Sequence, residues 1–244
     1  ITYGFSPQAD IHVSNVRFTT DGSVFDVKIS GWLCDDGQDL ILRDVALPIY
    51  GNHNVLNSLV ALAIGHEMGM APPLLKKGLS EFGGVKRRFT KTGVVNDITI
   101  IDDYAHHPKE IETVLKAARQ ALNGRTGRVI SVMQPHRFTR LHDLFEEFCT
   151  CFNEADSVLI TDVYRAGEDP IEGADRDHLV EGIRAHGHKS VAALNSRESL
   201  ATQVAEIARA GDFVICMGAG DITYWAYALP DELKAELDKK SSAA

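Results

Sequence analysis

The sequence predicts an α/β protein in which a mostly parallel sheet with helices on both faces follows a smaller segment of antiparallel strands and helices. Two residue patterns lead to this prediction. Up to about residue 50, short runs alternate apolar and polar positions around turn residues. Beyond residue 84, apolar runs alternate with stretches of helical spacing, and this order produces parallel strands joined by crossover helices.

The first segment alternates apolar and polar residues between positions 11 and 42, which predicts three or four antiparallel strands with a tight turn at Asp21-Gly22. Residues 51–68 then have their apolar positions at helical spacing, and Gly69 is expected to end that helix. A second helix is expected over residues 73–82.

The Gly83-Gly84 pair separates the two patterns and predicts a flexible joint, so we expect two domains, residues 1–83 and 84–244. Strands and helices alternate in the second domain. The expected strands are residues 92–95, 98–101, 128–133, 157–161 and 213–217, with a short one around Val191. The expected helices are residues 108–122, 141–153, 177–186, 196–210 and 230–240. This alternation is typical of a Rossmann-like domain.

Composition excludes several classes of protein. The formal net charge is −9 and no basic run is longer than Lys86-Arg87-Arg88, which argues against a nucleic-acid partner because phosphate contacts need Lys and Arg patches. No apolar stretch approaches the roughly 20 residues that span a bilayer, and the N-terminus does not resemble a signal peptide. We therefore expect no membrane partner and a cytoplasmic location. The four scattered cysteines are expected to be reduced and buried.

The most polar stretch runs from Asp102 to His107, where two acids, a tyrosine and two histidines separate an apolar run from a helix expected at Pro108. This stretch is expected to be the loop that leaves the carboxyl end of a strand, where open α/β sheets bind ligands. The acids and histidines fit a metal site, hydrogen bonding to a nucleotide or substrate, or helix capping. We favour hydrogen bonding, because the N-terminus of a helix disfavours a cation.

Two further clusters each have two interpretations. His53, Asn54 and Asn57 lie at the start of the first expected helix, where they either cap the helix or read the hydrogen-bonding edge of a base. The run Lys86-Arg87-Arg88 follows the glycine pair. It is either a solvated surface segment or the source of a guanidinium that holds a phosphate in an interdomain cleft.

A fourth cluster, at residues 134–140, follows an expected strand. Arg137 and Arg140 are three residues apart, with His136 beside them. Like charges near the positive end of a helix are destabilising without an anion, so this spacing predicts a site for a carboxylate or phosphate. The Gly218-Ala219-Gly220-Asp221 string also follows a strand, but glycine-rich turns are common.

Six strings together resemble the Mur ligase family: GNHNVLN, FGGVKRRF, DDYAHHPKEI, QPHRFTR, YRAGEDPIEG and GAGDI. The resemblance covers essentially all 244 residues and matches the end of the family's central ATPase domain and its C-terminal domain. The phosphate-binding string G-x-x-x-x-G-K-S/T is not found, and Gly187-His188-Lys189-Ser190 lacks its spacing. We therefore expect a fragment of a longer ligase that is inactive by itself.

The resemblance implies an ATP- and Mg²⁺-dependent enzyme that forms an amide bond through an acyl phosphate in peptidoglycan synthesis. The QPHRFTR string favours members that join L-alanine to UDP-N-acetylmuramate over members that reattach recovered murein tripeptide. A non-catalytic nucleotide-binding module and a metal-dependent hydrolase remain alternatives. A homodimer stays open.

The resemblance also implies roles for individual side chains. Contacts with the adenine of ATP are expected from His53, Asn54 and Asn57. Arg88 is expected to contact its phosphates, and Asp103 its ribose. Positions near the reacting groups are expected for Tyr104, His106 and Arg88. Contacts with the carboxylate of alanine are expected from His136, Arg137 and Arg140. No metal ligand is assigned in this chain, because the family's magnesium ligands are expected upstream of Ile1.

Overall fold

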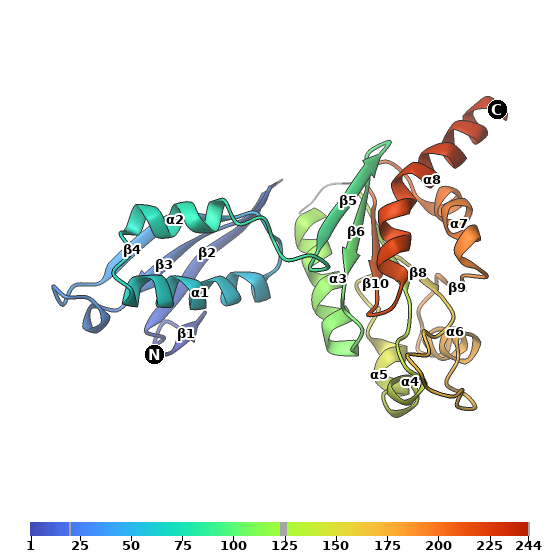
Figure 1. The fold of residues 1–244 in the computed structure, drawn as a ribbon, viewed down its shortest axis with the longest axis horizontal. Coiled ribbons are helices and arrows are strands. Elements are labelled where there is room, and N and C mark those ends of the chain that lie inside the picture. Colours follow the sequence, from blue (N-terminus) through green and yellow to red (C-terminus); the bar gives the residue numbers. More distant parts are fainter. Residues whose placement is uncertain (20, 123–125, 244) are drawn as a thin grey trace. The chain divides into compact units, whose positions relative to one another are not determined.

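A computed structural model describes residues 1–19, 21–122 and 126–243. The chain divides into two compact units, Ile1–Gly84 and Val85–Ala244, which Figure 1 colours from blue to red along the sequence. Each unit has its own sheet and its own hydrophobic core.

The first unit contains a four-stranded sheet with its strands in sequence order. The strands are β1 (Tyr3–Gly4), β2 (Ile11–Thr19), β3 (Gly22–Ile29) and β4 (Leu40–Leu47), and the helices are α1 (Asn52–Glu67) and α2 (Pro72–Ser80). Strands β2, β3 and β4 are antiparallel as expected, whereas the short β1 pairs with β2 in parallel. The turn expected at Asp21-Gly22 lies where β2 connects to β3, and Thr20 is outside the described residues.

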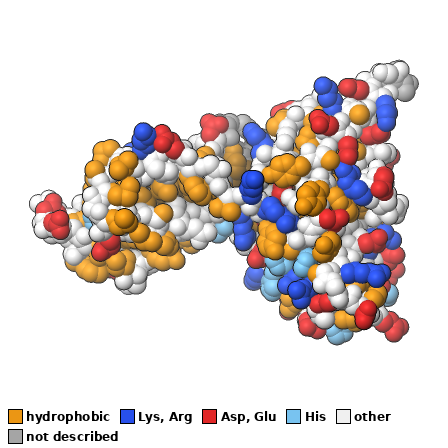
Figure 2. Space-filling model, in the orientation of Figure 1, with side chains coloured by type: hydrophobic (Ala, Val, Ile, Leu, Met, Phe, Trp, Pro, Cys, Tyr) orange, Lys and Arg blue, Asp and Glu red, His pale blue; other side chains and the backbone are white. Residues whose placement is uncertain are grey.

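Helix α1 is apolar on two sides. Its inner side chains Val55, Leu59 and Leu62 are buried against the sheet. On its outer side Val60 and Ile64 are exposed, and residues 52–66 contain no Asp, Glu, Lys or Arg. Figure 2 shows hydrophobic side chains gathered over the helices of this unit. A helix with apolar residues all round is usually covered on both sides.

The second unit contains a six-stranded sheet in the order β5-β6-β10-β7-β8-β9. Strand β5 is antiparallel to β6, and the other neighbours are parallel. The strands are β5 (Thr90–Val95), β6 (Ile98–Asp103), β7 (Val129–Met133), β8 (Ser157–Ile160), β9 (Val191–Ala193) and β10 (Phe213–Met217). The helices are α3 (Pro108–Leu122), α4 (Phe138–Asp143), α5 (Phe145–Thr150), α6 (Arg176–Ala185), α7 (Leu200–Ile207) and α8 (Ile222–Ala243).

Helices cover both faces of this sheet (Figure 1). Successive side chains of a strand point to opposite faces, so Ile100, Val132 and Val214 share one face and pack with α7 and α8. Helices α3 and α6 pack on the strands from the other face. The predicted α/β fold with a mostly parallel sheet is confirmed.

Several predicted boundaries are wrong. Asp102 and Asp103 are the last residues of β6 and not part of the loop, because Cys216 and Met217 of β10 pair with them. The helix predicted over 141–153 is two helices, since the backbone at Leu144 (φ −119°, ψ 26°) is not helical. The helix predicted over 196–210 starts with a separate turn, where Ser196 and Ser199 form a reciprocal capping box.

The helix predicted over 230–240 is the second half of α8, because Pro230 lies inside that helix and does not begin it. Proline cannot donate to the carbonyl four residues earlier. That carbonyl, on Ala226, instead accepts from Thr92 Oγ1 at 2.8 Å. Thr92 lies at an irregularity in the pairing of β5 with β6, and at the next residue, Gly93, a Cβ would come within 2.6 Å of Pro230 Cγ. The irregularity at Thr92 and the missing side chain at Gly93 therefore allow β5 to pack against α8 at Pro230.

Candidate functional site

The candidate site lies at the carboxyl edge of the second sheet, where the loops after β6, β7, β8 and β10 meet. Parallel neighbours bring these strand ends to one edge. Three hydrogen bonds connect the loops: Gly218 N donates to Asp103 O at 3.2 Å, Gln134 N to Met217 O at 2.9 Å, and Arg137 N to Tyr164 O at 2.9 Å. The polar side chains that the sequence placed after separate strands therefore lie close together.

Four aromatic side chains form a row along this edge, here called the aromatic row: Tyr104, His106, His136 and Tyr164. The ring centroids of Tyr104 and His106 are 5.0 Å apart, edge to face, and those of His106 and His136 are 5.9 Å apart. His136 and Tyr164 are stacked, with centroids 5.4 Å apart and an angle of 9° between their planes. The row thus brings together predicted site residues from two loops.

The two imidazoles of the row have different hydrogen-bond partners. His106 Nδ1 is 2.8 Å from Tyr104 O, and a carbonyl only accepts, so the proton is assigned to Nδ1 and a neutral His106 keeps an acceptor at Nε2. His136 Nδ1 is 3.3 Å from Arg140 Nη1, and a guanidinium only donates, so Nε2 carries the proton. Burial and the Arg140 charge lower the pKa of His136, which keeps this ring neutral.

The two predicted anion-binding arginines differ in their surroundings. Arg140 is half-buried, and its Nη1 also donates to His136 O at 3.0 Å. Arg137 is exposed, lies 3.6 Å from Glu168 Oε1, and has a backbone φ of 75°. Glu168 accepts from the backbone and the hydroxyl of Thr139, and these bonds lower its pKa.

The two acids at the end of β6 point to opposite sides of the sheet. Asp102 is fully buried and accepts from Thr223 Oγ1 at 2.7 Å. Burial raises the pKa of Asp102, against the opposing effects of Thr223 and Arg87. Asp103 is 2% exposed, and its two oxygens accept from the amides of Phe89 and Ala105 at 2.7 and 2.8 Å. Burial raises the pKa of Asp103 to about 6.

The metal site that was the alternative interpretation of residues 102–107 is not formed by the described residues, in which no group of three or more His, Cys, Asp and Glu side chains could hold an ion. The N-terminus of α3 is already occupied, because Glu110 Oε2 accepts from the amides of His106 and His107 at 3.0 and 3.2 Å. Burial acts to raise the pKa of Glu110, but these bonds and the nearby His106 together outweigh it and lower that pKa. His107 itself is exposed.

The turn after β10 is held by Gln134, which is 4% exposed. Its Nε2 donates to Asp221 Oδ1 at 2.7 Å, and its Oε1 accepts from Ile222 N at 3.2 Å. Beside it, a Cβ at Gly220 would lie 2.4 Å from Gln134 Oε1 and 2.6 Å from the ring of Tyr164. The turn therefore packs directly on the aromatic row.

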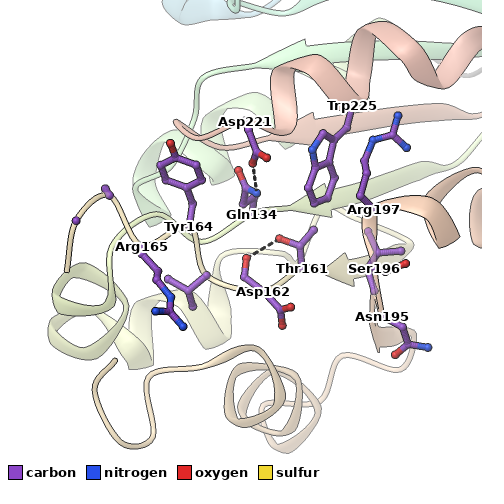
Figure 3. A pocket seen from close by; sticks show the side chains of 14 residues that line it. Gln134, Thr161, Asp162, Tyr164, Arg165, Asn195, Ser196, Arg197, Asp221 and Trp225 are labelled. Atoms are coloured by element: carbon purple, nitrogen blue, oxygen red, sulfur yellow. Dashed lines mark hydrogen bonds between the residues drawn. The ribbon is translucent and has the colours of Figure 1, made fainter. Parts of the chain in front are cut away.

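A groove of about 760 Å³ opens next to this turn. In Figure 3, Tyr164 and Arg165 lie on one side of it and Trp225 and Arg197 on the other, with Gln134 between them. Arg197 is held by two hydrogen bonds to Glu232, at 2.6 and 2.8 Å.

The predicted adenine-contacting residues belong to the first unit. His53, Asn54 and Asn57 lie in the first two turns of α1. The capping interpretation is wrong, since the N-cap is Gly51 and no side-chain hydrogen bond is formed at that cap. Asn54 Nδ2 donates back to Tyr50 O at 2.8 Å, and Asn57 is exposed.

Sequence reasoning missed Arg87. Arg88, which was predicted as the site residue, is exposed, whereas Arg87 lies over the ring of Tyr104, with its guanidinium carbon 4.6 Å from the centroid. Nothing in the run Lys86-Arg87-Arg88 distinguishes its members. Glu110 had a signal that was overlooked, because an acid in the first turn of a helix often accepts from the amides before it.

Residues 87–220 match the family model described as Mur ligase, glutamate ligase domain. The chain therefore belongs to the Mur ligase family. It is similar to proteins named UDP-N-acetylmuramate–L-alanine ligase: it is 57% identical over 236 residues to one from Maricaulis maris (strain MCS10) and 55% identical over 235 residues to one from Rhodopseudomonas palustris (strain HaA2).

Both alignments cover 96% of this chain and 49% of the relative, so the chain spans about half the length of these curated relatives. The crystal structure of a UDP-N-acetylmuramate-alanine ligase from Thermotoga maritima shares the fold, with a TM-score of 0.72 at 22% identity. That match covers 100% of this chain and 48% of the other. Among the described residues, no helix combines the length and apolarity needed to cross a membrane.

Proposed function

We propose that this chain is part of a UDP-N-acetylmuramate–L-alanine ligase, a cytoplasmic enzyme that uses ATP to join L-alanine to UDP-N-acetylmuramate in peptidoglycan synthesis. The observation that carries the proposal is the 57% identity to the Maricaulis maris protein of that name across 96% of the chain. The guanidinium and imidazole groups at the carboxyl edge support it, because these substrates carry phosphates and carboxylates.

In the proposed reaction, the lactyl carboxylate of UDP-N-acetylmuramate attacks the γ-phosphorus of ATP, which gives an acyl phosphate and ADP. The amine of alanine loses a proton and attacks the acyl carbon, and phosphate leaves as the amide bond forms. Catalysis of this kind depends mainly on positioning and charge stabilisation. Mg²⁺ is proposed to accompany ATP, and we assign none of its ligands to this chain.

The carboxylate of alanine is proposed to meet His136, Arg137 and Arg140. A neutral His136 offers an Nε2–H donor, because Arg140 already donates to its Nδ1. Arg137 lies 3.6 Å from Glu168, which is longer than a hydrogen bond, so its guanidinium keeps donors for a ligand. The amine is proposed to pass its proton to Nε2 of His106, with Tyr104 beside it.

The nucleotide is proposed to meet His53, Asn54 and Asn57 at its adenine, Arg88 at its phosphates and Asp103 at its ribose. Asp103 is 2% exposed, so a ribose hydroxyl would reach it only after the Phe89 amide moves from its Oδ2. The first unit is proposed to be the end of a central ATP-binding domain, and the second a C-terminal ligase domain.

The test uses the longer natural protein that contains this sequence, incubated with UDP-N-acetylmuramate, ATP, Mg²⁺ and labelled L-alanine. We expect labelled UDP-N-acetylmuramoyl-L-alanine and one ADP for each amide bond, and no product from the 244-residue chain alone. Faster reaction with murein tripeptide than with alanine would instead indicate the recycling activity. ATP binding without turnover of either substrate would indicate a nucleotide-binding module.

A further inference from the structure

Arg87 has an unusual backbone and a well-defined side chain. Its φ of 59° is in the left-handed region, which is unfavourable for a residue other than glycine and persists only where surrounding contacts hold it. Its Nη2 donates to Gly218 O at 2.5 Å and to Gly220 O at 3.3 Å. The guanidinium is therefore fixed to the turn after β10.

Arg87 also holds Tyr104 in two ways. The guanidinium lies 4.6 Å from the centroid of the tyrosine ring, a cation–π contact, and the carbonyl of Arg87 accepts from Tyr104 N at 2.8 Å. Tyr104 in turn accepts the Nδ1–H of His106 at its own carbonyl. The position of Arg87 thus sets the position of Tyr104, and Tyr104 sets the tilt of the His106 ring.

These contacts link the two ends of the aromatic row, so that the row, Arg87 and the turn after β10 form a closed chain of contacts. At one end of the row, Tyr164 packs against Gly220, where a Cβ would be only 2.6 Å away. At the other end, Tyr104 lies under the guanidinium that donates to the carbonyl of the same glycine. Arg87, from the segment before β5, therefore joins the loop after β6 to the turn after β10, and the aromatic row continues from Tyr104 to the loops after β7 and β8.

A buried acid interacts electrostatically with this guanidinium. Asp102 is fully buried and attracts Arg87, yet Arg87 Nε and Asp102 Oδ1 are both buried without a hydrogen bond in the described part of the chain. Loss of Arg87 would leave Asp102 without its nearby cation. A positive charge at position 87 therefore serves both Asp102 and the closed chain of contacts, whereas the planar shape of the guanidinium is needed only for that chain of contacts.

We propose that Arg87 is a positioning residue. It completes the closed chain of contacts and thereby holds Tyr104 and His106 in the orientations in which they meet the reacting groups. The second half of this proposal rests on the proposed function, and the first half does not. Arg88 is exposed and has no part in the closed chain of contacts, although it is the neighbour proposed to meet phosphate.

The first experiment uses the 244-residue chain and requires no substrate. Ring ¹H and ¹³C shifts of Tyr104 and His106 are compared by NMR in Arg87→Ala, Arg87→Lys and the exposed control Lys86→Ala. Both Arg87 variants are expected to move these signals, and Lys86→Ala is not. Arg87→Lys keeps the charge beside Asp102, so it serves as the folded variant if Arg87→Ala unfolds. Unchanged ring signals in folded Arg87→Lys would overturn the proposal.

The second experiment measures the same variants in the longer protein. We expect kcat to fall about 10- to 100-fold in Arg87→Lys while the KM values for ATP and alanine stay within about threefold, because misplaced reacting groups slow chemistry more than binding. Lys86→Ala is expected to keep wild-type kcat. A loss confined to KM would overturn the positioning role. If wild-type protein makes no product, the proposed function fails and the NMR result alone decides whether Arg87 orients the row.

Discussion

His106 and His136 lie 5.9 Å apart between ring centroids, and in their neutral forms the hydrogen-bond partners assign the proton to Nδ1 of His106 and to Nε2 of His136. At Nε2, His106 therefore offers an acceptor and His136 offers a donor. A zwitterionic amino acid needs both, since its ammonium must lose a proton while its carboxylate must be held.

The charge of Arg140 should control the titration of His136. Burial and then Arg140 lower the pKa of His136, so Arg140→Ala is expected to raise that pKa without restoring its full ordinary value. NMR titration of the His136 ring in the 244-residue chain measures this effect. Arg119→Ala, far away at the end of α3, is the control. An unchanged or lower pKa in Arg140→Ala would show that the guanidinium does not act on this ring.

In the longer protein, Arg137→Ala should weaken alanine binding more than ATP binding. The guanidinium is proposed to meet the carboxylate of alanine, and a charged hydrogen bond contributes about 1.5–3 kcal/mol. The KM for alanine is thus expected to rise about tenfold or more and the KM for ATP to change little. Steady-state kinetics with each substrate varied in turn measures both constants, and the reverse ranking would remove Arg137 from the alanine site.

Thr92 and Pro230 should be energetically coupled. Thr92→Val removes the donor to Ala226 O, and an unsatisfied buried carbonyl costs about 1–3 kcal/mol. In a Pro230→Ala background the new amide can donate to the same carbonyl, so Thr92→Val should cost about 1 kcal/mol less. Denaturant unfolding followed by Trp225 fluorescence, in a chain with Trp32→Phe, measures all four variants of the second unit. Additive effects would contradict this coupling.

Gly93→Ala should destabilise the second unit by about 1–3 kcal/mol, because its Cβ would overlap Pro230 Cγ at 2.6 Å and force α8 away from β5. Gly83→Ala is a matched control, since a Cβ there meets nothing within 4 Å. Thermal unfolding monitored by Trp225 compares the two. Equal midpoints would mean that α8 yields without cost.

Asp103 should make the second unit less stable as pH rises. Burial raises its pKa to about 6, so the folded state holds this proton more tightly than the unfolded chain does. The resulting stability is fully present below about pH 4 and is lost as pH rises through about 6. The stability of wild type relative to Asp103→Asn should therefore fall by up to about 3 kcal/mol between pH 4 and 7. A rising or flat difference would contradict this assignment.

Local sequence was sufficient where one element settles its own structure. Helix α3 has the predicted bounds because Pro108 fixes its first turn and its apolar residues have helical spacing. Strand β10 is short, apolar and followed directly by Gly218, and it too has the predicted bounds. Helix α8 was predicted incorrectly because the donor that tolerates Pro230 is Thr92, which is remote in sequence and reaches the helix only in the folded sheet.

The site was predictable to the level of which loops contribute and not to the level of which side chain points inward. The sequence predicted that His106 and His136 follow two strands of a parallel sheet. Because the carboxyl ends of parallel strands lie at one edge, both side chains were expected there. Arg87 and Arg88 are chemically identical neighbours, and a backbone φ of 59° at Arg87 separates their roles. That angle depends on contacts with Tyr104 and Gly218, which no local pattern contains.

Strand β10 follows every other strand in the chain but lies between β6 and β7, to both of which it pairs. A ribosome therefore releases β6 and β7 long before the strand that must separate them. Until β10 arrives, both of its future neighbours present unpaired edges, which are templates for wrong pairing. The second unit should complete its sheet only after β10 has been synthesised, and slow release of that strand should expose the unit to aggregation.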